Sequence, residues 1–345
     1  MGPEKRVNPL PPLPREDLED VFRQVGDAWE KLRGRNVFIS GASGFFGSWL
    51  LDTLLFSADR RQLGTKAWAL TRDADRFRLR LPHLAGHPAV ELVGGGVEQF
   101  VFPKEKMAYV IHSLVPDPGM PLPEMEKWFE MGTRRLLELA ARDRSEGFLL
   151  CSTGAVYQPQ NRPLSEEDPL IPLDSPLTYG RIRRQVEDQC LAVCGKEGIP
   201  LKIARGFAFA GPRLPENAGF ALADFLRDAK EGRSIRVKGT GEPTRSYLYA
   251  ADMAVWLWKI FLNPLGNGIF NVGSPEGVRI IEVAEMITTL THTEFQILGQ
   301  PESGASQNTH YVPITKKAFS QLEVTLSRSL LELLHASIHS SQKVI

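Results

Sequence analysis

The segment from Asn36 to Leu51 constrains the fold of this chain more than any other part of the sequence. Its β-branched and aromatic residues predict a buried strand that stops at Gly41, and two further glycines lead into an apolar helical pattern. In such a strand–turn–helix unit, backbone N–H groups approach a pyrophosphate at the positive end of the helix. We therefore expect Gly41 to make the turn, Gly44 to admit the phosphate, and Gly47 to let the helix pack closely on the strand.

Strand and helix patterns alternate from residue 37 to residue 204. This alternation predicts an α/β fold, a doubly wound parallel sheet of the Rossmann type with helices on both faces. Ligands of such sheets bind at the carboxyl ends of the strands. An amphipathic stripe over residues 16–33 predicts one N-terminal helix that packs on this domain. The predicted strands are 37–40, 67–70, 90–93, 109–112, 147–151 and 201–204, and the predicted helices between them are 46–56, 73–81, 125–142 and 179–194.

The alternation weakens after Arg205, which predicts a second, smaller C-terminal domain. A chain of 345 residues is long enough for two such domains. We expect an N-terminal arm and helix (1–34), a dinucleotide-binding Rossmann domain (35–205, with late sheet elements from 234–272), and a substrate-binding domain (206–233 and 273–345).

The composition excludes several function classes. The 41 basic and 41 acidic side chains cancel, so no charge excess predicts a nucleic-acid partner. The three cysteines, Cys151, Cys190 and Cys194, form no CxxC motif, and we expect neither a metal site nor a disulfide framework. No apolar run has transmembrane length. These features predict a cytoplasmic enzyme without a membrane partner.

Seven short segments occur in the order typical of one enzyme family. The chain resembles the extended short-chain dehydrogenase/reductase family, in particular its nucleotide-sugar epimerases and dehydratases, over roughly residues 35–320. The segments are GASGFFG (41–47), VIHS (110–113), LLCSTGAVY (149–157), TYGRIRR (178–184), ARGFAFAGPR (204–213), RSYLYAAD (245–252) and FNVGS (270–274).

Three residues are candidates for catalysis. A tyrosinate can take the proton of a sugar hydroxyl if a nearby cation lowers its pKa from about 10 toward neutrality. Tyr179, with Arg183 one helical turn later, supplies that pair, and Thr153 supplies a hydroxyl that holds the same substrate oxygen. The family has lysine where this chain has Arg183. Arginine keeps the charge, but its planar fork would contact the nicotinamide ribose differently.

The end of the second strand bears on cofactor choice. Thr71 stands where an acidic residue would bind the ribose 2′-hydroxyl of NAD. The next residue, Arg72, suits the 2′-phosphate of NADP. We therefore expect NADP, with NAD bound through Asp73 as the alternative.

The resemblance also implies further ligand contacts. Gly96 stands where relatives commonly have an acid that binds the adenine, and Arg245 matches an arginine that grips the nucleotide diphosphate. The alternative for Arg245 is a structural salt bridge to Asp252 or Glu242. The implied cofactor contacts are Gly41, Ser43, Gly44, Phe45, Phe46, Gly47, Thr71, Arg72, Gly96, Val97, Leu114, Ser152, Tyr179, Arg183 and Phe207, and the implied substrate contacts are Ser113, Thr153, Asn217 and Arg245.

The loop after Thr153 discriminates among reactions. Gly154 and Ala155 stand where 4,6-dehydratases have an Asp-Glu pair, and the acid that decarboxylating relatives use in this loop is also missing. The resemblance therefore implies an epimerase or a keto-sugar reductase that acts on a nucleotide sugar. The alternatives are a catalytically impaired sugar-nucleotide-binding protein and a nucleotide-sugar dehydratase. The family resemblance also implies a homodimer formed through two helices, one of which carries Tyr179.

Overall fold

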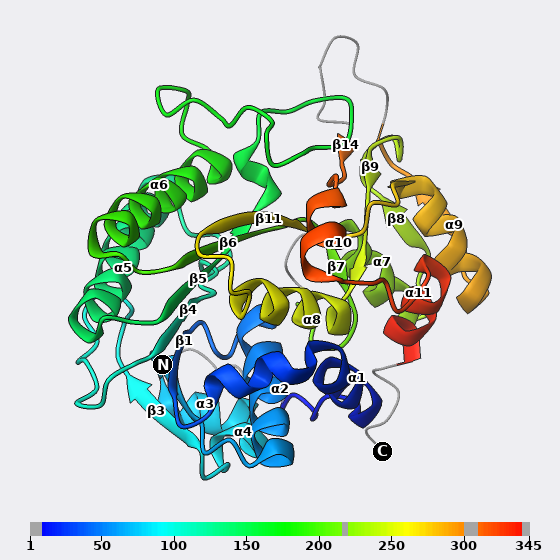
Figure 1. Cartoon of the computed structure of the whole chain (residues 1–345). Helices are drawn as coiled ribbons and strands as arrows, with labels where there is room; N and C mark the ends of the chain where they lie inside the picture. Colours follow the sequence, from blue (N-terminus) through cyan, green and yellow to red (C-terminus); the bar gives the residue numbers. More distant parts are fainter. Residues whose placement is uncertain (1–8, 216–219, 300–309, 340–345) are drawn as a thin grey trace, which may run out of the picture. The chain divides into compact units, whose positions relative to one another are not determined.

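The computed structural model describes residues 9–215, 220–299 and 310–339 (Figure 1). The chain divides into two compact units. The first consists of Met1–Ser152, Pro172–Ala204 and Leu257–Ile269, and the second of Thr153–Ile171, Arg205–Trp256 and Phe270–Ile345.

A seven-stranded sheet forms the centre of the first unit, and its strand order is β11-β6-β5-β4-β1-β2-β3. The pairs β1–β2, β1–β4, β2–β3 and β4–β5 are parallel, which confirms the predicted Rossmann-type sheet. The order reverses at β1, so the carboxyl ends of β1 and β4 mark the point where ligands bind in such folds. The strands are β1 (Asn36–Ser40), β2 (Lys66–Thr71), β3 (Val90–Gly94), β4 (Tyr109–His112), β5 (Gly147–Thr153), β6 (Leu201–Gly206) and β11 (Gly268–Val272).

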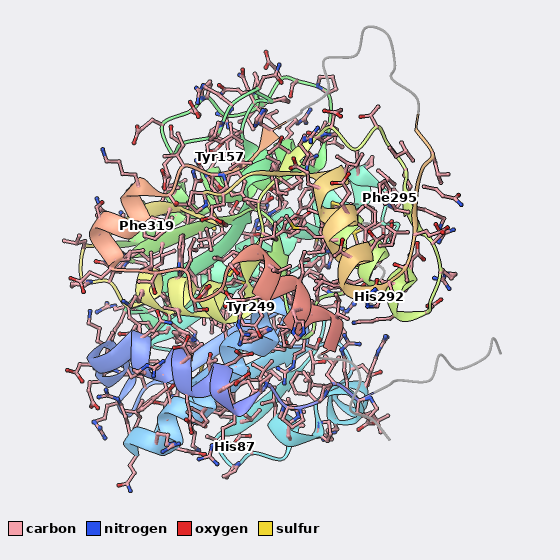
Figure 2. All side chains as sticks on the ribbon, turned by 90° about the vertical axis from the view of Figure 1, so that its right-hand side faces the viewer. His87, Tyr157, Tyr249, His292, Phe295 and Phe319 are labelled. Atoms are coloured by element: carbon pink, nitrogen blue, oxygen red, sulfur yellow. The ribbon has the colours of Figure 1, made fainter. Side chains whose placement is uncertain are left out.

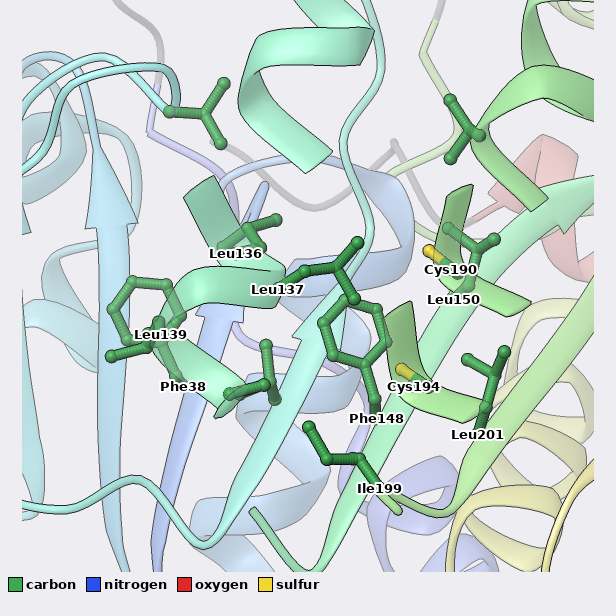
Figure 3. Packing of buried hydrophobic residues seen from close by; sticks show 14 of the residues in the cluster. Phe38, Leu136, Leu137, Leu139, Phe148, Leu150, Cys190, Cys194, Ile199 and Leu201 are labelled. Atoms are coloured by element: carbon green, nitrogen blue, oxygen red, sulfur yellow. The ribbon is translucent and has the colours of Figure 1, made fainter. Parts of the chain in front are cut away.

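Apolar side chains of helices α5 and α6 pack against the sheet in the first unit. Figure 3 shows Phe148 of β5 among Leu137 of α5 and the thiols Cys190 and Cys194 of α6. All of these side chains are at most 1% exposed, so the cysteines serve here as core residues. The helices of this unit are α1 (Arg15–Val25), η1 (Gly26–Leu32), α2 (Phe45–Arg61), α3 (Ala74–Arg80), α4 (Pro82–Ala85), α5 (Leu122–Asp143) and α6 (Tyr179–Glu197).

The N-terminal segment differs from the single helix predicted over 16–33. Helix α1 ends before Gly26, whose φ of +61° lies in the left-handed region, and a 3-10 helix, η1, follows. The apolar stripe was read correctly as packing on the domain, because Trp29 of η1 is fully buried with its ring centroid 4.9 Å from that of Trp258.

The second unit contains short strands and helices. Figure 2 labels His292, the residue that caps the end of α9, and Phe295, the first residue of β13. Its sheets pair β10 with β7, β13 with β8, and β12 with β9 and β14. The elements are β7 (Phe209–Ala210), α7 (Ala221–Lys230), β8 (Ile235–Val237), β9 (Thr244–Arg245), β10 (Leu248–Tyr249), α8 (Ala250–Phe261, which continues into the first unit), β12 (Val278–Arg279), α9 (Ile280–Thr291), β13 (Phe295–Ile297), β14 (His310–Tyr311), α10 (Lys316–Leu322) and α11 (Leu330–His339).

Two details of the expected division differ from the observed one. Of the strands in residues 234–272, only β11 joins the large sheet, while β8, β9 and β10 pair within the second unit. Residues 153–171, expected in the Rossmann domain, belong to the second unit. Strand pattern alone does not specify which partner a two- or three-residue strand finds.

Candidate active site

The glycine turn between β1 and α2 is packed too tightly for larger residues at two of its three glycines. Gly41 has a φ of +73°, and a Cβ on it would come within 2.4 Å of the Ser113 carbonyl oxygen. A Cβ on Gly47 would lie 2.2 Å from the Gly41 carbonyl oxygen. The sequence predicts that Gly47 lets the helix pack on the strand; in the structure, the close contact of Gly47 is with Gly41 and Ala42 of the turn that follows the strand. A Cβ on Gly44 meets only the Gly41 carbonyl oxygen, at 3.2 Å, which leaves its outer side open to a ligand.

Residues on both sides of this turn hold it in place. Phe45 is buried and Phe46 half-buried at the start of α2, with ring centroids 5.8 Å apart. Ser43 is also half-buried. Ser113, a predicted substrate contact, is 3% exposed, and its hydroxyl donates to the Ser40 carbonyl at 2.6 Å. The structure therefore gives Ser113 a role in tying the end of β4 to the end of β1, while its contact with substrate stays a prediction. Leu114 is half-buried against the core of this unit.

Arg183 lies in the interior of the first unit. It is 1% exposed, its Nη2 donates to the Cys151 carbonyl at 2.6 Å, and its guanidinium carbon lies 4.6 Å from the centroid of the Phe129 ring. Within the described part of the chain, its Nε and Nη1 find no hydrogen-bond partner. Buried N–H donors without acceptors are rare, so these two atoms fit a hydroxyl-bearing ligand such as the ribose of a dinucleotide.

Tyr179 stands at the first position of the same helix and has the opposite exposure. Thr178 caps the helix by accepting from the Arg181 N–H at 3.2 Å, which fixes where α6 begins. Tyr179 is 36% exposed, so its phenol is accessible to a ligand, whereas Arg183 one turn later is not. The helix therefore presents one exposed phenol and one buried cation.

A buried carboxylate on α6 was missed by the sequence reasoning. Ser152, a predicted cofactor contact, donates its hydroxyl to Glu187 Oε1 at 2.5 Å, and Glu187 is 1% exposed. The signal was present, because Tyr179, Arg183 and Glu187 follow at four-residue intervals and share one face of the helix.

Thr153 belongs to the second unit, where a tyrosine that sequence reasoning missed contacts it. Its Oγ1 accepts from the Ala155 N–H at 3.2 Å and lies 3.1 Å from the Tyr311 hydroxyl. The Tyr311 hydroxyl in turn lies 3.3 Å from the Gly206 carbonyl oxygen, to which it can only donate. In the Thr153–Tyr311 pair either hydroxyl can be the donor. No motif around Tyr311 marks it in the sequence.

Phe207 closes the loop that follows Thr153. Its ring centroid lies 4.7 Å from that of Tyr311, and a Cβ on Gly154 would come within 2.7 Å of its ring. Phe207 is 8% exposed, so its predicted cofactor contact stays a prediction for the backbone of this residue.

Arg245 is half-buried in the second unit, near the same tyrosine. Its Nη1 donates to the Thr244 carbonyl, and its guanidinium carbon lies 5.8 Å from the centroid of the Tyr311 ring. Burial lowers the pKa of Arg245. The two acids weighed as structural partners bind elsewhere: Glu242 lies 3.7 Å from Arg279, and Asp252 accepts from a backbone N–H of residue 327. The predicted substrate contact Asn217 lies outside the described residues.

At the end of β2, Arg72 has a partner that the sequence did not indicate. Its two Nη groups donate to the Asp117 carboxylate at 2.6 and 2.8 Å, and this hydrogen bonding lowers the pKa of Asp117. Asp73, the alternative NAD contact, accepts from the Arg76 N–H and caps α3. Thr71 is half-buried, and its hydroxyl donates to the Asp73 carbonyl at 2.9 Å.

The turn after β3 contains the remaining predicted cofactor contacts. Val97 is 3% exposed and packs so closely on Gly132 of α5 that a Cβ there would meet it at 2.6 Å. The Glu98 carboxylate covers Gly96, because a Cβ on Gly96 would lie 2.4 Å from Glu98 Oε1. Among the described residues, no three His, Cys, Asp or Glu side chains are grouped as metal ligands, and no helix is both long and apolar enough to span a bilayer.

This parallel sheet, its glycine turn and the Tyr179 helix define a Rossmann-type nucleotide-binding enzyme fold. The chain belongs to the NAD dependent epimerase/dehydratase family, whose model matches residues 37–273. The predicted membership in the extended short-chain dehydrogenase/reductase enzymes is thereby confirmed.

Named relatives agree with this assignment. UDP-glucuronic acid decarboxylase 1 of Xenopus tropicalis is 27% identical over 300 residues, which cover 83% of this chain and 69% of the relative. A UDP-N-acetyl-alpha-D-glucosaminuronate decarboxylase of Bacillus cytotoxicus is 31% identical over 188 residues, 51% of this chain and 58% of the relative.

Among solved structures, the UDP-glucuronic acid 4-epimerase of Bacillus cereus in complex with NAD superposes with a TM-score of 0.74 at 20% identity and covers 88% of this chain and 97% of its own. An epimerase of Methanothermobacter thermautotrophicus gives a TM-score of 0.76 at 21% identity, with coverage of 92% and 95%. These similarities confirm the fold.

Proposed function

We propose that this enzyme interconverts nucleotide sugars by reversible oxidation and reduction at one sugar carbon, as an epimerase or a keto-sugar reductase. The observation that carries the proposal is the pairing on α6 of an exposed phenol, Tyr179, with a buried guanidinium, Arg183, that retains two unused donors. The glycine turn supplies the anion-binding end of a helix for the cofactor pyrophosphate.

Each residue then has a defined task. A bound nicotinamide cofactor would supply the hydride acceptor, and on reduction the hydride donor, for the sugar carbon. Tyr179 takes the proton of the sugar hydroxyl as that hydride leaves and gives it back on reduction, so protons and electrons balance. Arg183 holds the cofactor ribose through Nε and Nη1, and Glu187 holds Ser152 beside the end of β5. Thr153 donates a hydrogen bond to the reacting sugar oxygen, and Arg245 binds the nucleotide phosphates.

The loop after Thr153 favours simple oxidation and reduction over elimination. Gly154 and Ala155 bring no acid, and the Phe207 ring fills the space that a side chain at position 154 would need. The relatives favour a second candidate reaction, because six of those compared are UDP-glucuronic acid decarboxylases. Decarboxylation would begin with the same oxidation and would use the same Tyr179.

For the cofactor we propose NAD. The sequence predicts NADP from Arg72, but the fork of this arginine is filled by Asp117 through two hydrogen bonds. Structures of similar fold are described as complexes with NAD.

We also propose a homodimer formed through α5 and α6, and we keep the predicted cytoplasmic location as part of this proposal.

Turnover assays with single hydroxyl deletions test the proposal. The protein with NAD is mixed in turn with UDP-glucose, UDP-glucuronic acid and their N-acetylated analogues, and products are followed by NMR, which also detects release of carbon dioxide. Tyr179→Phe should lower kcat by about 100-fold or more in a protein that still folds and binds NAD. Tyr109→Phe is the matched control, because Tyr109 starts β4 at the opposite end of the strand from the glycine turn.

The outcomes separate the candidate functions. Inverted sugars without carbon dioxide support the epimerase, and pentose products support the decarboxylase. Binding of nucleotide sugars without turnover supports the catalytically impaired protein. Full activity of Tyr179→Phe would contradict the mechanism.

A further inference from the structure

The carboxyl end of β2 lacks the residue that usually selects a cofactor. In a doubly wound sheet, the adenosine ribose of a dinucleotide lies at this strand end, where an acid accepts the 2′-hydroxyl. Here Thr71 ends the strand and Arg72 follows. A guanidinium alone at this position would attract a 2′-phosphate. Two carboxylates from other parts of the first unit oppose the positive charge of Arg72.

Asp117 supplies the first carboxylate. It comes from the loop between β4 and α5, and it grips Arg72 with both oxygens in the bidentate geometry that makes Arg–carboxylate pairs strongest. A local turn positions it, because the Met120 N–H donates to the Asp117 carbonyl and Gly119 adopts a φ of +85°. The pair is partly exposed, with side-chain accessibilities of 63% and 55%, so its effect is electrostatic rather than structural.

Glu98 supplies the second carboxylate. The turn after β3 lies beside the end of β2, because Thr71 is in register with Gly94 and its carbonyl accepts from the Gly95 N–H at 3.0 Å. On this turn the Glu98 carboxylate covers Gly96. Its Oε2 is buried and, among the described residues, has no hydrogen-bond partner. The Asp117 hydrogen bond and, less strongly, the charges of Asp117 and Glu98 raise the pKa of Arg72.

We propose that Asp117 and Glu98 determine cofactor choice by outweighing the charge of Arg72. Asp117 neutralises the guanidinium directly, Glu98 adds a negative charge on the neighbouring turn, and the charges of Asp73 and Arg76 at the start of α3 offset each other. The strand end therefore does not attract the nearly dianionic 2′-phosphate of NADP. The unsatisfied Glu98 oxygen accepts a hydrogen bond from the adenosine half of NAD. Selection of NAD is thus achieved from the loops after β3 and β4 instead of from β2. This inference rests on the dinucleotide binding of the proposed function.

Binding measurements test the inference without turnover. Dissociation constants for NAD and NADP are measured by calorimetry on the wild-type protein and its variants without a sugar nucleotide, so no turnover occurs. Asp117→Asn and Glu98→Gln keep shape and remove one charge each, and each should shift the affinity ratio toward NADP by about fivefold, with a larger shift for the double variant. The shift should shrink at 0.5 M salt, since these charges are partly exposed. Asp75→Asn is the matched control, because its carboxylate pairs with Arg78 on α3.

Each result decides the question. A ratio that moves toward NADP in both variants and not in the control supports the inference. A ratio that stays at the wild-type value in both variants, with NAD binding and melting temperature intact, overturns it, as does wild-type preference for NADP. Failure of the wild type to bind either dinucleotide would instead remove the proposed function, and with it this inference.

Discussion

At the scale of single residues, the most unusual feature is a cation, Arg183, that is buried between the sheet and its helices. Arg183 shares the interior between β4, β5 and α5 with His112, a fully buried residue whose Nε2 lies 2.9 Å from the Thr133 hydroxyl. Burial first, and the charge of Arg183 second, depress the pKa of His112 well below its ordinary value of 6.5. The histidine therefore stays neutral and leaves Arg183 as the positive charge of this region.

The neutral His112 predicts a specific pH dependence of stability. Below pH 6.5 the unfolded chain gains a proton at this residue and the folded protein does not, so the free energy of unfolding falls as the pH falls. The loss reaches at most about 1.4 kcal/mol per pH unit, or about 2 kcal/mol between pH 6.5 and 5. Between pH 6.5 and 5, the free energy of unfolding of His112→Gln, measured with urea, should fall by about 2 kcal/mol less than that of the wild type. His292→Gln, a surface imidazole, is the matched control, and equal slopes for wild type and His112→Gln would contradict the prediction.

The contact of Tyr311 with Thr153 predicts coupled effects on turnover. Without its partner the Thr153 hydroxyl loses a fixed orientation, so Tyr311→Phe should lower kcat by about tenfold with little change in KM or in the melting temperature. Thr153→Val should lower kcat more, and the double variant should lose no more than Thr153→Val alone. Tyr311 is a positioning residue, because it acts on the reaction only through the orientation of Thr153. Fully additive losses of kcat would show that Tyr311 does not act through Thr153.

At the scale of elements, Gly47 and Gly44 of the β1–α2 turn are expected to have different roles, one in stability and one in cofactor binding. Gly47→Ala forces a methyl group to 2.2 Å from the Gly41 carbonyl, so it should lower the free energy of unfolding by about 3 kcal/mol and abolish NAD binding. Gly44→Ala meets the same carbonyl at 3.2 Å, so it should cost under about 1 kcal/mol while weakening NAD binding through crowding of the pyrophosphate. Urea unfolding and calorimetry check both, and equal destabilisation by the two variants would contradict this division.

Sequence patterns predict the elements well where the signal is local. Strand β4 has the predicted bounds Tyr109–His112, because the β-branched pair Val110-Ile111 is flanked by two ring side chains that favour extended backbone. Helix α2 continues to Arg61, beyond the predicted end at Phe56, because polar residues extend it until Gln62 adopts a left-handed conformation. The break in the N-terminal helix at Gly26 depends on a backbone angle that amphipathic periodicity does not report.

The candidate site was predictable only in part. Its ordered motifs indicate the glycine turn and Tyr179, since each is a contiguous segment with its own geometry. The partners Asp117 on Arg72 and Tyr311 on Thr153 lie 45 and 158 residues away along the chain, and no local pattern connects them. Such pairings depend on loop conformation, which decides whether an arginine is free for a phosphate.

At the scale of the whole molecule, the proposed dimer needs a face that two copies can share. Helices α5 and α6 lie side by side and leave a groove of about 370 Å³. It is lined by Glu126, Phe129, Glu130, Arg134, Ile182, Gln185, Val186 and Gln189. In a twofold interface the same surface of both subunits is buried, so a charge introduced on this face occurs twice in the interface, once from each copy.

That doubling predicts how the dimer can be split. Arg134 is the basic side chain that lines the groove, and it forms a salt bridge with Glu130 at 2.6 Å. In Arg134→Glu every charged side chain that lines the groove would be negative. Like charges would then face each other across the twofold axis. Sedimentation velocity over a range of concentrations should show a dimer for the wild type and a dissociation constant raised by at least about tenfold for Arg134→Glu. Arg15→Glu makes the same charge change on α1 and should leave the dimer intact. A monomeric wild type, or a dimer equally stable in Arg134→Glu, would show that α5 and α6 do not form the interface.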